Sequence, residues 1–130
     1  MVEWRLPDVN RVVLSGRLTR DPDRRYASDG TAVTRFDLAF HRRVRARNGQ
    51  ISESTGYVSV TTYQRLAEVC AEALRKGSPV LIEGRLVARE WNTPQGGSRS
   101  RLELAADNVH FLERRADAAP AEPAEGKKAF

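Results

Sequence analysis

Apolar and polar residues alternate along three stretches in the first half of the chain, which is the pattern of strands that bury one face. The stretches are residues 12–18, a segment that begins after the turn Ser28-Asp29-Gly30, and residues 57–63. Asp21-Pro22-Asp23 ends the first stretch, and Asn48-Gly49 is a turn signal between the other two. The pattern therefore predicts three strands, with a hairpin joining the second to the third.

The buried face of each predicted strand follows from the parity of its apolar residues, because successive side chains of a strand point to opposite faces. The side chains expected to point inward, together with Gly16, are Val12, Leu14, Leu18, Phe36, Leu38, Phe40, Val58 and Val60. Tyr57 and Tyr63 have the opposite parity. Both tyrosines should therefore lie on the outer face of the third strand.

Apolar residues at intervals of three and four positions replace the alternation from Gln64 onward, as in a helix with one buried side. The residues on that side are Leu66, Val69, Cys70, Ala73 and Leu74. Arg75-Lys76-Gly77 then supplies basic residues and a glycine, a common C-terminal stop. The pattern predicts this one helix.

Alternation returns after the helix and indicates two further strands joined by a polar hairpin loop at residues 92–97. Their inward residues are Val80, Ile82, Leu86 and Ala88, then Leu102, Leu104 and Ala106, with Val109 and Leu112 as a short extension. Gly84 falls on the inward set of the first of these strands, where a glycine can let the strand bend sharply.

Three strands, one helix and two strands is the order of an OB-fold, an all-β, five-stranded barrel whose helix lies between the third and fourth strands. We assign residues 1–112 to this domain. Residues 113–130 consist mainly of Ala, Pro, Glu and Lys without periodicity, so we expect a disordered tail. The outer face and loops of such a barrel can form a groove for a polymer.

The chain carries a net charge of +5, and the excess belongs to the predicted barrel. Residues 1–112 contain 18 basic and 13 acidic side chains, a difference of five, and 17 of the basic ones are arginine. Arginine both pairs with phosphate through two N–H groups and stacks on rings. The composition favours a polyanionic partner, with a merely solvated basic surface as the alternative.

Several functional classes lack the residues they require. Cys70 is the only cysteine, which excludes an internal disulfide and a cysteine-based zinc site. His41 and His110 are the only histidines, and no glycine-rich phosphate loop or nucleophile elbow is present. No apolar run reaches the length of a membrane span, and the N-terminus lacks a signal-peptide pattern. We predict a cytoplasmic protein that is not an enzyme and needs no cofactor or metal.

Aromatic and basic residues share the predicted outer faces of two strands. Tyr57 and Tyr63 lie outward on the third strand, as do Arg85, Arg89 and Trp91 on the fourth. If both strands wall one groove, each ring can stack on an unpaired base for about 1 to 3 kcal/mol while arginines contact phosphates. The alternative for each single ring is packing at the barrel rim.

A basic hairpin follows the second strand. Its arginines are Arg42, Arg43, Arg45 and Arg47, with no acid among residues 42–47. Because these charges repel one another, a bound anion is favoured over a merely solvated loop.

Six blocks of sequence resemble the bacterial single-stranded DNA-binding protein family in order and spacing, and the similarity extends from about Asn10 to Leu112. The blocks are Asn10–Leu18, Asp21-Pro22 with Arg25-Tyr26, Gly30–Val33, Leu66–Glu72, Lys76–Ser78 and Glu83–Leu86.

This resemblance implies an OB-fold without a cofactor that binds single-stranded DNA over its outer faces during replication, recombination or repair. It also implies a homotetramer formed by pairing of dimers, associated with the nucleoid in the cytoplasm. The family's stacking aromatics correspond to Tyr57, Tyr63 and Trp91. Its basic contacts correspond to Arg11, Arg25, Arg65 and Arg89.

The chain departs from the family pattern at two places. Val44 occupies a position where many members have another stacking tryptophan, so the neighbouring arginines are expected to compensate and to raise the sensitivity to salt. The tail ends in Lys127-Lys128-Ala129-Phe130 rather than in an acidic cluster with an apolar pair. This reversed charge puts recruitment of repair and replication enzymes in doubt and suggests a secondary paralogue.

Two other functions remain open at this point. A primosome-type OB-fold adaptor would use the same face mainly for protein–protein contacts and would be a dimer with weak DNA affinity. An OB-fold nuclease would need clustered acids and a metal.

Overall fold

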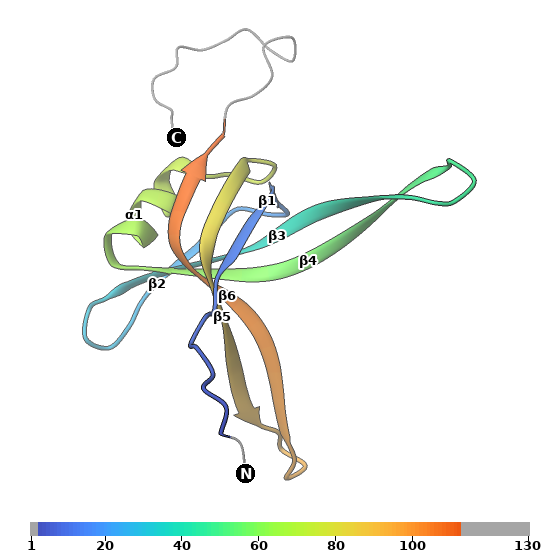
Figure 1. The fold of residues 1–130 in the computed structure, drawn as a ribbon. Helices are drawn as coiled ribbons and strands as arrows, with labels where there is room; N and C mark the ends of the chain where they lie inside the picture. The colour runs from blue at the N-terminus through green and yellow to red at the C-terminus, as the bar shows by residue number, and fades with distance from the viewer. Residues whose placement is uncertain (1–2, 113–130) are drawn as a thin grey trace, which may run out of the picture.

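The computed structural model describes residues 3–112, which contain both the predicted helix and the predicted strands (Figure 1). The elements are β1 (Val12–Leu18), β2 (Asp23–Tyr26), β3 (Ala32–Arg45), β4 (Ile51–Tyr63), α1 (Gln64–Ala73), β5 (Pro79–Asn92) and β6 (Ser98–Phe111). In this described part no helix is long and apolar enough to cross a membrane. The predicted tail, residues 113–130, lies outside the described residues.

Strand β1 closes the barrel because it pairs with two different strands. It runs antiparallel to β5, with Val12 opposite Gly84, and its end pairs with β3, with Leu18 opposite Leu38. The other pairings join β5 to β6, β6 to β4 and β4 to β3, and β4 and β6 are parallel. With α1 between β4 and β5 in the chain, the predicted five-stranded OB-fold is confirmed.

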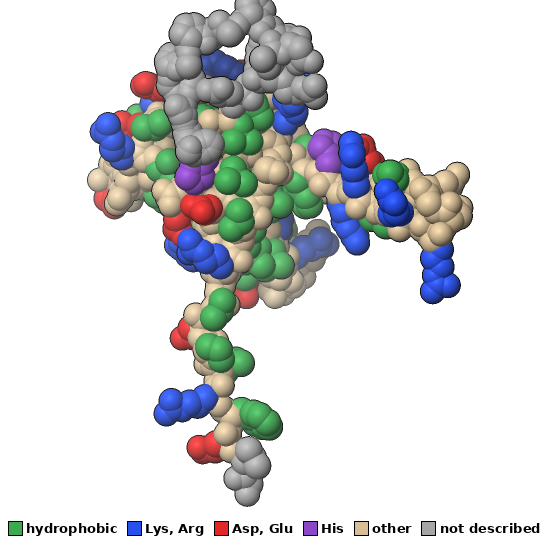
Figure 2. Space-filling view, turned by 45° about the horizontal axis from the view of Figure 1, so that its top comes forward, with side chains coloured by type: hydrophobic (Ala, Val, Ile, Leu, Met, Phe, Trp, Pro, Cys, Tyr) green, Lys and Arg blue, Asp and Glu red, His purple; other side chains and the backbone are tan. Residues whose placement is uncertain are grey.

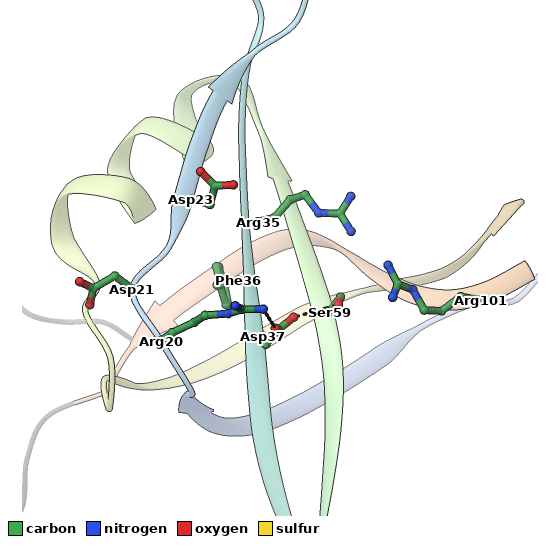
Figure 3. A pocket seen from close by; sticks show the side chains of 8 residues that line it. All are labelled: Arg20, Asp21, Asp23, Arg35, Phe36, Asp37, Ser59 and Arg101. Carbon is green, nitrogen blue, oxygen red and sulfur yellow. Dashed lines mark hydrogen bonds and ion pairs between the residues drawn. The ribbon is translucent and has the colours of Figure 1, made fainter. Parts of the chain in front are cut away.

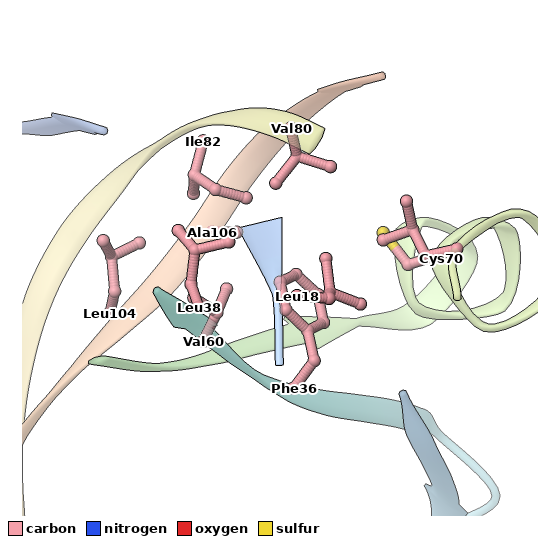
Figure 4. Close-up of a cluster of buried hydrophobic side chains, with 10 residues drawn as sticks. Leu18, Phe36, Leu38, Val60, Cys70, Val80, Ile82, Leu104 and Ala106 are labelled. Atoms are coloured by element: carbon pink, nitrogen blue, oxygen red, sulfur yellow. The ribbon is translucent and has the colours of Figure 1, made fainter. Parts of the chain in front are cut away.

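The hydrophobic core fills the barrel, and α1 packs against it (Figure 4). Its buried side chains are Leu18, Phe36, Leu38, Val60, Cys70, Leu74, Val80, Ile82, Leu104 and Ala106. The hydroxyl of Thr34 on β3 also donates a 2.7 Å hydrogen bond to the carbonyl oxygen of Ala67 in α1. Parity and helical spacing had assigned all of the core side chains to the inside.

The inward assignment is wrong where the strands continue beyond the barrel. Leu86 and Leu102 are 40% and 61% exposed, and Ala88 is exposed as well. Their alternation continues along β5 and β6, but no other layer covers that face. On α1, Val69 and Ala73 are also exposed, so the buried side of the helix is narrower than expected.

Both hairpins were predicted, but β4 and β6 begin earlier in the chain than expected, at Ile51 and Ser98, and the short strand β2 was not predicted. β3 and β4 stay paired as far as Arg45 opposite Ile51, and β5 and β6 as far as Asn92 opposite Ser98. Figure 1 shows both arms projecting from the barrel in different directions. β2 pairs with the edge of β3 and is exposed along its whole length, so no alternation of apolar residues could reveal it.

The bend expected at Gly84 coincides with a close approach of two strands. The pairing of β5 with β6 shifts register between Glu83 and Gly84. A Cβ atom at Gly84 would collide with the carbonyl oxygen of Ala105 on β6. Glycine is needed here because the obstacle is backbone, which cannot move aside as a flexible side chain can.

We predict that Gly84→Ala lowers the free energy of unfolding by about 1 to 3 kcal/mol, the usual cost of forcing an extra carbon into a packed site. Gly97→Ala is the matched control, because a Cβ there would lie 3.6 Å from the Thr93 hydroxyl, an ordinary contact. Urea unfolding of both variants measures the difference. Equal stability of the two variants would contradict the close approach at Gly84.

Candidate nucleic-acid interface

The candidate interface is the outer face of four neighbouring strands, in the order β3, β4, β6 and β5. The register places Arg35 opposite Thr61 and Thr61 opposite Ala105. Ala105 in turn lies opposite Arg85, so one row of outward positions crosses all four strands. The aromatic and basic residues predicted on β4 and β5 therefore share one face, with β6 between them.

Glu103 of β6 is a buried carboxylate in this outer face, and three arginines surround it. Arg35 and Arg101 each donate a hydrogen bond from Nη2 to its Oε2, at 2.8 and 3.0 Å. Arg89 donates from Nε to Oε1 at 3.2 Å. The arginines belong to β3, β6 and β5, so one carboxylate connects three strands. We call these four residues the Glu103 cluster.

The pKa of Glu103 reflects two opposing effects. Burial disfavours the charged form and by itself would raise the pKa. The hydrogen bonds from Arg35, Arg89 and Arg101, together with the positive charge of Arg35, outweigh burial and lower the pKa below its ordinary value. The carboxylate is therefore ionised at neutral pH and neutralises part of the arginine charge.

A hollow of about 420 Å³ adjoins the Glu103 cluster (Figure 3). Its lining residues are Arg20, Asp21, Asp23, Arg35, Phe36, Asp37, Ser59 and Arg101. Asp37 accepts hydrogen bonds from Arg20 Nη2 at 2.7 Å and from the Ser59 hydroxyl at 2.9 Å. Burial opposes ionisation of Asp37, but these bonds and the nearby arginine charges lower its pKa overall. Three arginines and three aspartates thus line the hollow.

The three predicted stacking residues are all accessible. Tyr57 is 70% exposed, Tyr63 45% and Trp91 43%. Cζ of Arg101 lies 5.9 Å from the centroid of the Trp91 ring, which is within the range of a cation–π contact. Trp91 therefore lies directly beside the Glu103 cluster.

The basic hairpin forms the end of the β3–β4 arm. Arg42 lies opposite Ser54 and Arg43 opposite Glu53, so neighbouring arginines of the strand point to the two faces of the arm. Figure 2 shows basic side chains on both sides of it. Arg43 makes a 3.4 Å ion pair with Glu53. The repulsion expected among these arginines is therefore partly offset at Arg43 by an acid on the neighbouring strand β4.

The remaining predicted arginines lie around the barrel. Arg11 directly precedes β1, beside Asn10, whose side chain donates to and accepts from the backbone of Leu86. Arg25 of β2 lies opposite Val33, which lies opposite Tyr63, but Arg25 is paired with Asp23 at 3.0 Å.

Arg65 lies in the first turn of α1. It follows Gln64, which joins β4 directly to the helix and has φ of 61°. This left-handed conformation is uncommon for a residue with a side chain and turns the chain sharply between Tyr63 and Arg65.

Sequence reasoning missed the Glu103 cluster as a unit. Arg35 has outward parity on its strand, and so has Glu103, but the strand order that brings them together was not visible. It also missed Tyr26 on β2, which is 59% exposed with Cζ of Arg24 5.9 Å from its ring centroid. To find the Glu103 cluster or Tyr26, one would have needed to know which strands pair with each other.

Comparison with known proteins identifies the family. Residues 9–112 match the model of the single-strand binding protein family. The chain belongs to this family. The resemblance seen in the six sequence blocks is confirmed.

Two curated members of the single-strand binding protein family show how far the similarity extends. The chain is 41% identical over 111 residues to single-stranded DNA-binding protein 2 of Chlorobaculum tepidum, covering 85% of this chain and 75% of that protein. It is 40% identical over 106 residues to the single-stranded DNA-binding protein of Thermotoga maritima, covering 82% of this chain and 75% of that protein.

Solved structures of the family share the fold. A deletion mutant of the single-stranded DNA-binding protein from Thermus aquaticus superimposes with a TM-score of 0.75 and 34% identity, covering 83% of this chain and 52% of that one. A Plasmodium falciparum single-stranded DNA-binding protein in complex with single-stranded DNA superimposes with a TM-score of 0.76 and 26% identity. That match covers 85% of this chain and all of the other.

We predict that Glu103→Gln makes stability less dependent on pH below the ordinary glutamate pKa of 4.5. Because folding lowers this pKa, the ionised carboxylate stabilises the protein above pH 4.5 and loses that effect as the pH falls through the folded-state value. Urea unfolding between pH 7 and pH 3 should show a steeper loss for the wild type than for the variant.

The control for this measurement is Glu90→Gln, which removes an exposed carboxylate from β5 and changes the net charge equally. If Glu103→Gln and Glu90→Gln give the same pH profile, the arginines do not hold Glu103 in the charged form.

Proposed function

We propose that the chain binds single-stranded DNA with little sequence preference and without catalysis. The observation that carries this proposal is the exposure of Tyr57, Tyr63 and Trp91 on one outer face that also bears arginines. Every base has a flat face, so stacking on these rings tolerates any sequence, while guanidinium groups contact the phosphates between the bases. The names of its relatives and the complex formed by its structural neighbour support the same ligand.

The barrel suits this task because its core and its outer face are independent. Side chains of one parity fill the core, and the exposed ones of the other parity can meet a ligand. The β3–β4 arm carries Arg42, Arg45 and Arg47 away from the barrel, which extends the basic surface along a bound strand. We therefore expect the strand to run over the outer face and along this arm.

Membership of the family supports a proposal about the wider role. We propose that the chain protects unpaired DNA in replication, recombination or repair in the cytoplasm, as a homotetramer that pairs two dimers. Mass by light scattering tests the assembly, and tight binding by a tetramer supports strand coating. A dimer with weak DNA affinity would instead support the primosome-type adaptor.

Titration with poly-dT should quench tryptophan fluorescence and saturate at a fixed ratio of nucleotide to protein. Trp91→Ala should remove most of the quenching and weaken binding about 5- to 150-fold, since one stacked base contributes about 1 to 3 kcal/mol. Trp4→Ala is the matched control, because Trp4 is 88% exposed in the segment before β1. If the quenching is lost in Trp4→Ala and kept in Trp91→Ala, the proposed stacking site is wrong.

The salt dependence of binding should report the arm arginines. If about five phosphates are neutralised, log K falls with log salt at a slope near −3.5, and Arg45→Gln should make the slope shallower by about 0.7. Arg75→Gln removes the same charge at a residue just after α1, whose guanidinium donates to the backbone carbonyls of Glu72 and Leu74. An equal change in slope for both variants would show that overall charge, and not the arm, determines the effect.

A further inference from the structure

We propose that Arg35, Arg89 and Arg101 form one phosphate-binding subsite and that Glu103 is the residue that positions them. This inference rests on the proposed binding of single-stranded DNA and assigns one place on the outer face where a phosphate of the strand is held. Arg35, Arg101 and Glu103 were not among the binding residues expected from the sequence.

The geometry gives the subsite a buried base and an accessible rim. The Glu103 side chain is 1% exposed, whereas those of Arg35, Arg89 and Arg101 are 34%, 47% and 54% exposed. Each arginine reaches the carboxylate with one of its nitrogens. A guanidinium carries five N–H donors in a rigid plane, so each retains further donors for a second anion.

The charge of the cluster also favours an anion. Three guanidinium groups and one carboxylate leave a net charge of +2 within a group held together by bonds of 2.8 to 3.2 Å. A phosphodiester carries one negative charge and accepts paired N–H bonds from arginine in good geometry. Such a ligand would reduce the remaining repulsion among the three arginines.

Glu103 is otherwise difficult to explain in a surface that binds a polyanion. A buried carboxylate repels phosphate and loses its hydration, so by itself it would weaken binding. Three arginines without a common partner would separate and rotate freely, and a ligand would have to order them at an entropic cost. Glu103 holds the three arginines in place before the ligand binds. The ligand therefore does not have to bear the entropic cost of ordering them.

The subsite adjoins a stacking residue. Arg101 lies over the Trp91 ring, with 5.9 Å between Cζ and the ring centroid, and Arg89 lies opposite Arg101 on the neighbouring strand. A phosphate held by the three arginines would therefore lie next to a base stacked on Trp91. The two contacts would fix one nucleotide of the strand.

The test compares two substitutions on β6 that each remove one negative charge. In Glu103→Gln the three arginines lose their common anion. In Asp107→Asn the 2.7 Å ion pair with Arg85 is lost, and the side chains of both of its residues are about half exposed. If charge alone matters, both variants bind oligo-dT more tightly than the wild type, with a steeper dependence on salt. If Glu103 positions the arginines, Asp107→Asn binds at least as tightly as the wild type, whereas Glu103→Gln binds several-fold more weakly.

The salt slope adds a readout that a purely structural role would not change. Loss of one phosphate contact should make the slope of log K against log salt shallower by about 0.7 for Glu103→Gln. Thermal unfolding establishes that the full-length variants are folded. Tighter binding and a steeper slope for Glu103→Gln, as for Asp107→Asn, would overturn the proposal.

Glu103→Asp provides a second variant in case Glu103→Gln does not fold. It keeps the negative charge but is one methylene shorter, so it cannot reach all three arginines. Weaker binding by Glu103→Asp supports positioning, and binding equal to that of the wild type overturns it. Failure of the wild type itself to bind oligo-dT would overturn the proposed function, whereas wild-type binding with unaffected Glu103 variants would overturn this inference alone.

Discussion

Closure of the barrel by β1 is the constraint on which the other features depend. β1 pairs with β5 along most of its length and with β3 at its end, and this is possible only where the strands can approach closely. Gly16 of β1 permits such an approach, because a Cβ atom at this position would collide with the carbonyl oxygen of Ala39 on β3. Closure separates inward side chains, which form the core, from outward ones, which are free for binding.

The outer face combines attraction for an anion with internal neutralisation. Its arginines are mostly held by acids, as Arg85 is by Asp107 and as three arginines are by Glu103. An arginine held in this way loses little conformational entropy when it binds a phosphate, which favours binding. The β3–β4 arm differs, because Arg42 and Arg45 make no ion pair among those of the described residues, so it contributes charge with less order.

The strands and the helix that bury one face could be predicted from the sequence. Alternation located Val12 to Leu18, the inward residues Phe36 and Leu38, and the helix around Cys70, because burial imposes a period on the chain. It could not locate β2, which is exposed throughout, or the exposure of Leu102, because the arms keep a strand pattern without a layer to cover them. Parity placed Tyr57 and Trp91 outward, but Glu103 required knowledge of which strands are neighbours.

The proposed function requires that single-stranded DNA lies on the outer face formed by β3, β4, β6 and β5. Photocrosslinking to an oligonucleotide that contains 5-iodo-deoxyuridine, followed by peptide mapping, tests it most directly, because crosslinks form with aromatic rings in contact with the base. We expect crosslinks at Tyr57, Tyr63 and Trp91. Crosslinks confined to Trp4 or Tyr26 would contradict it.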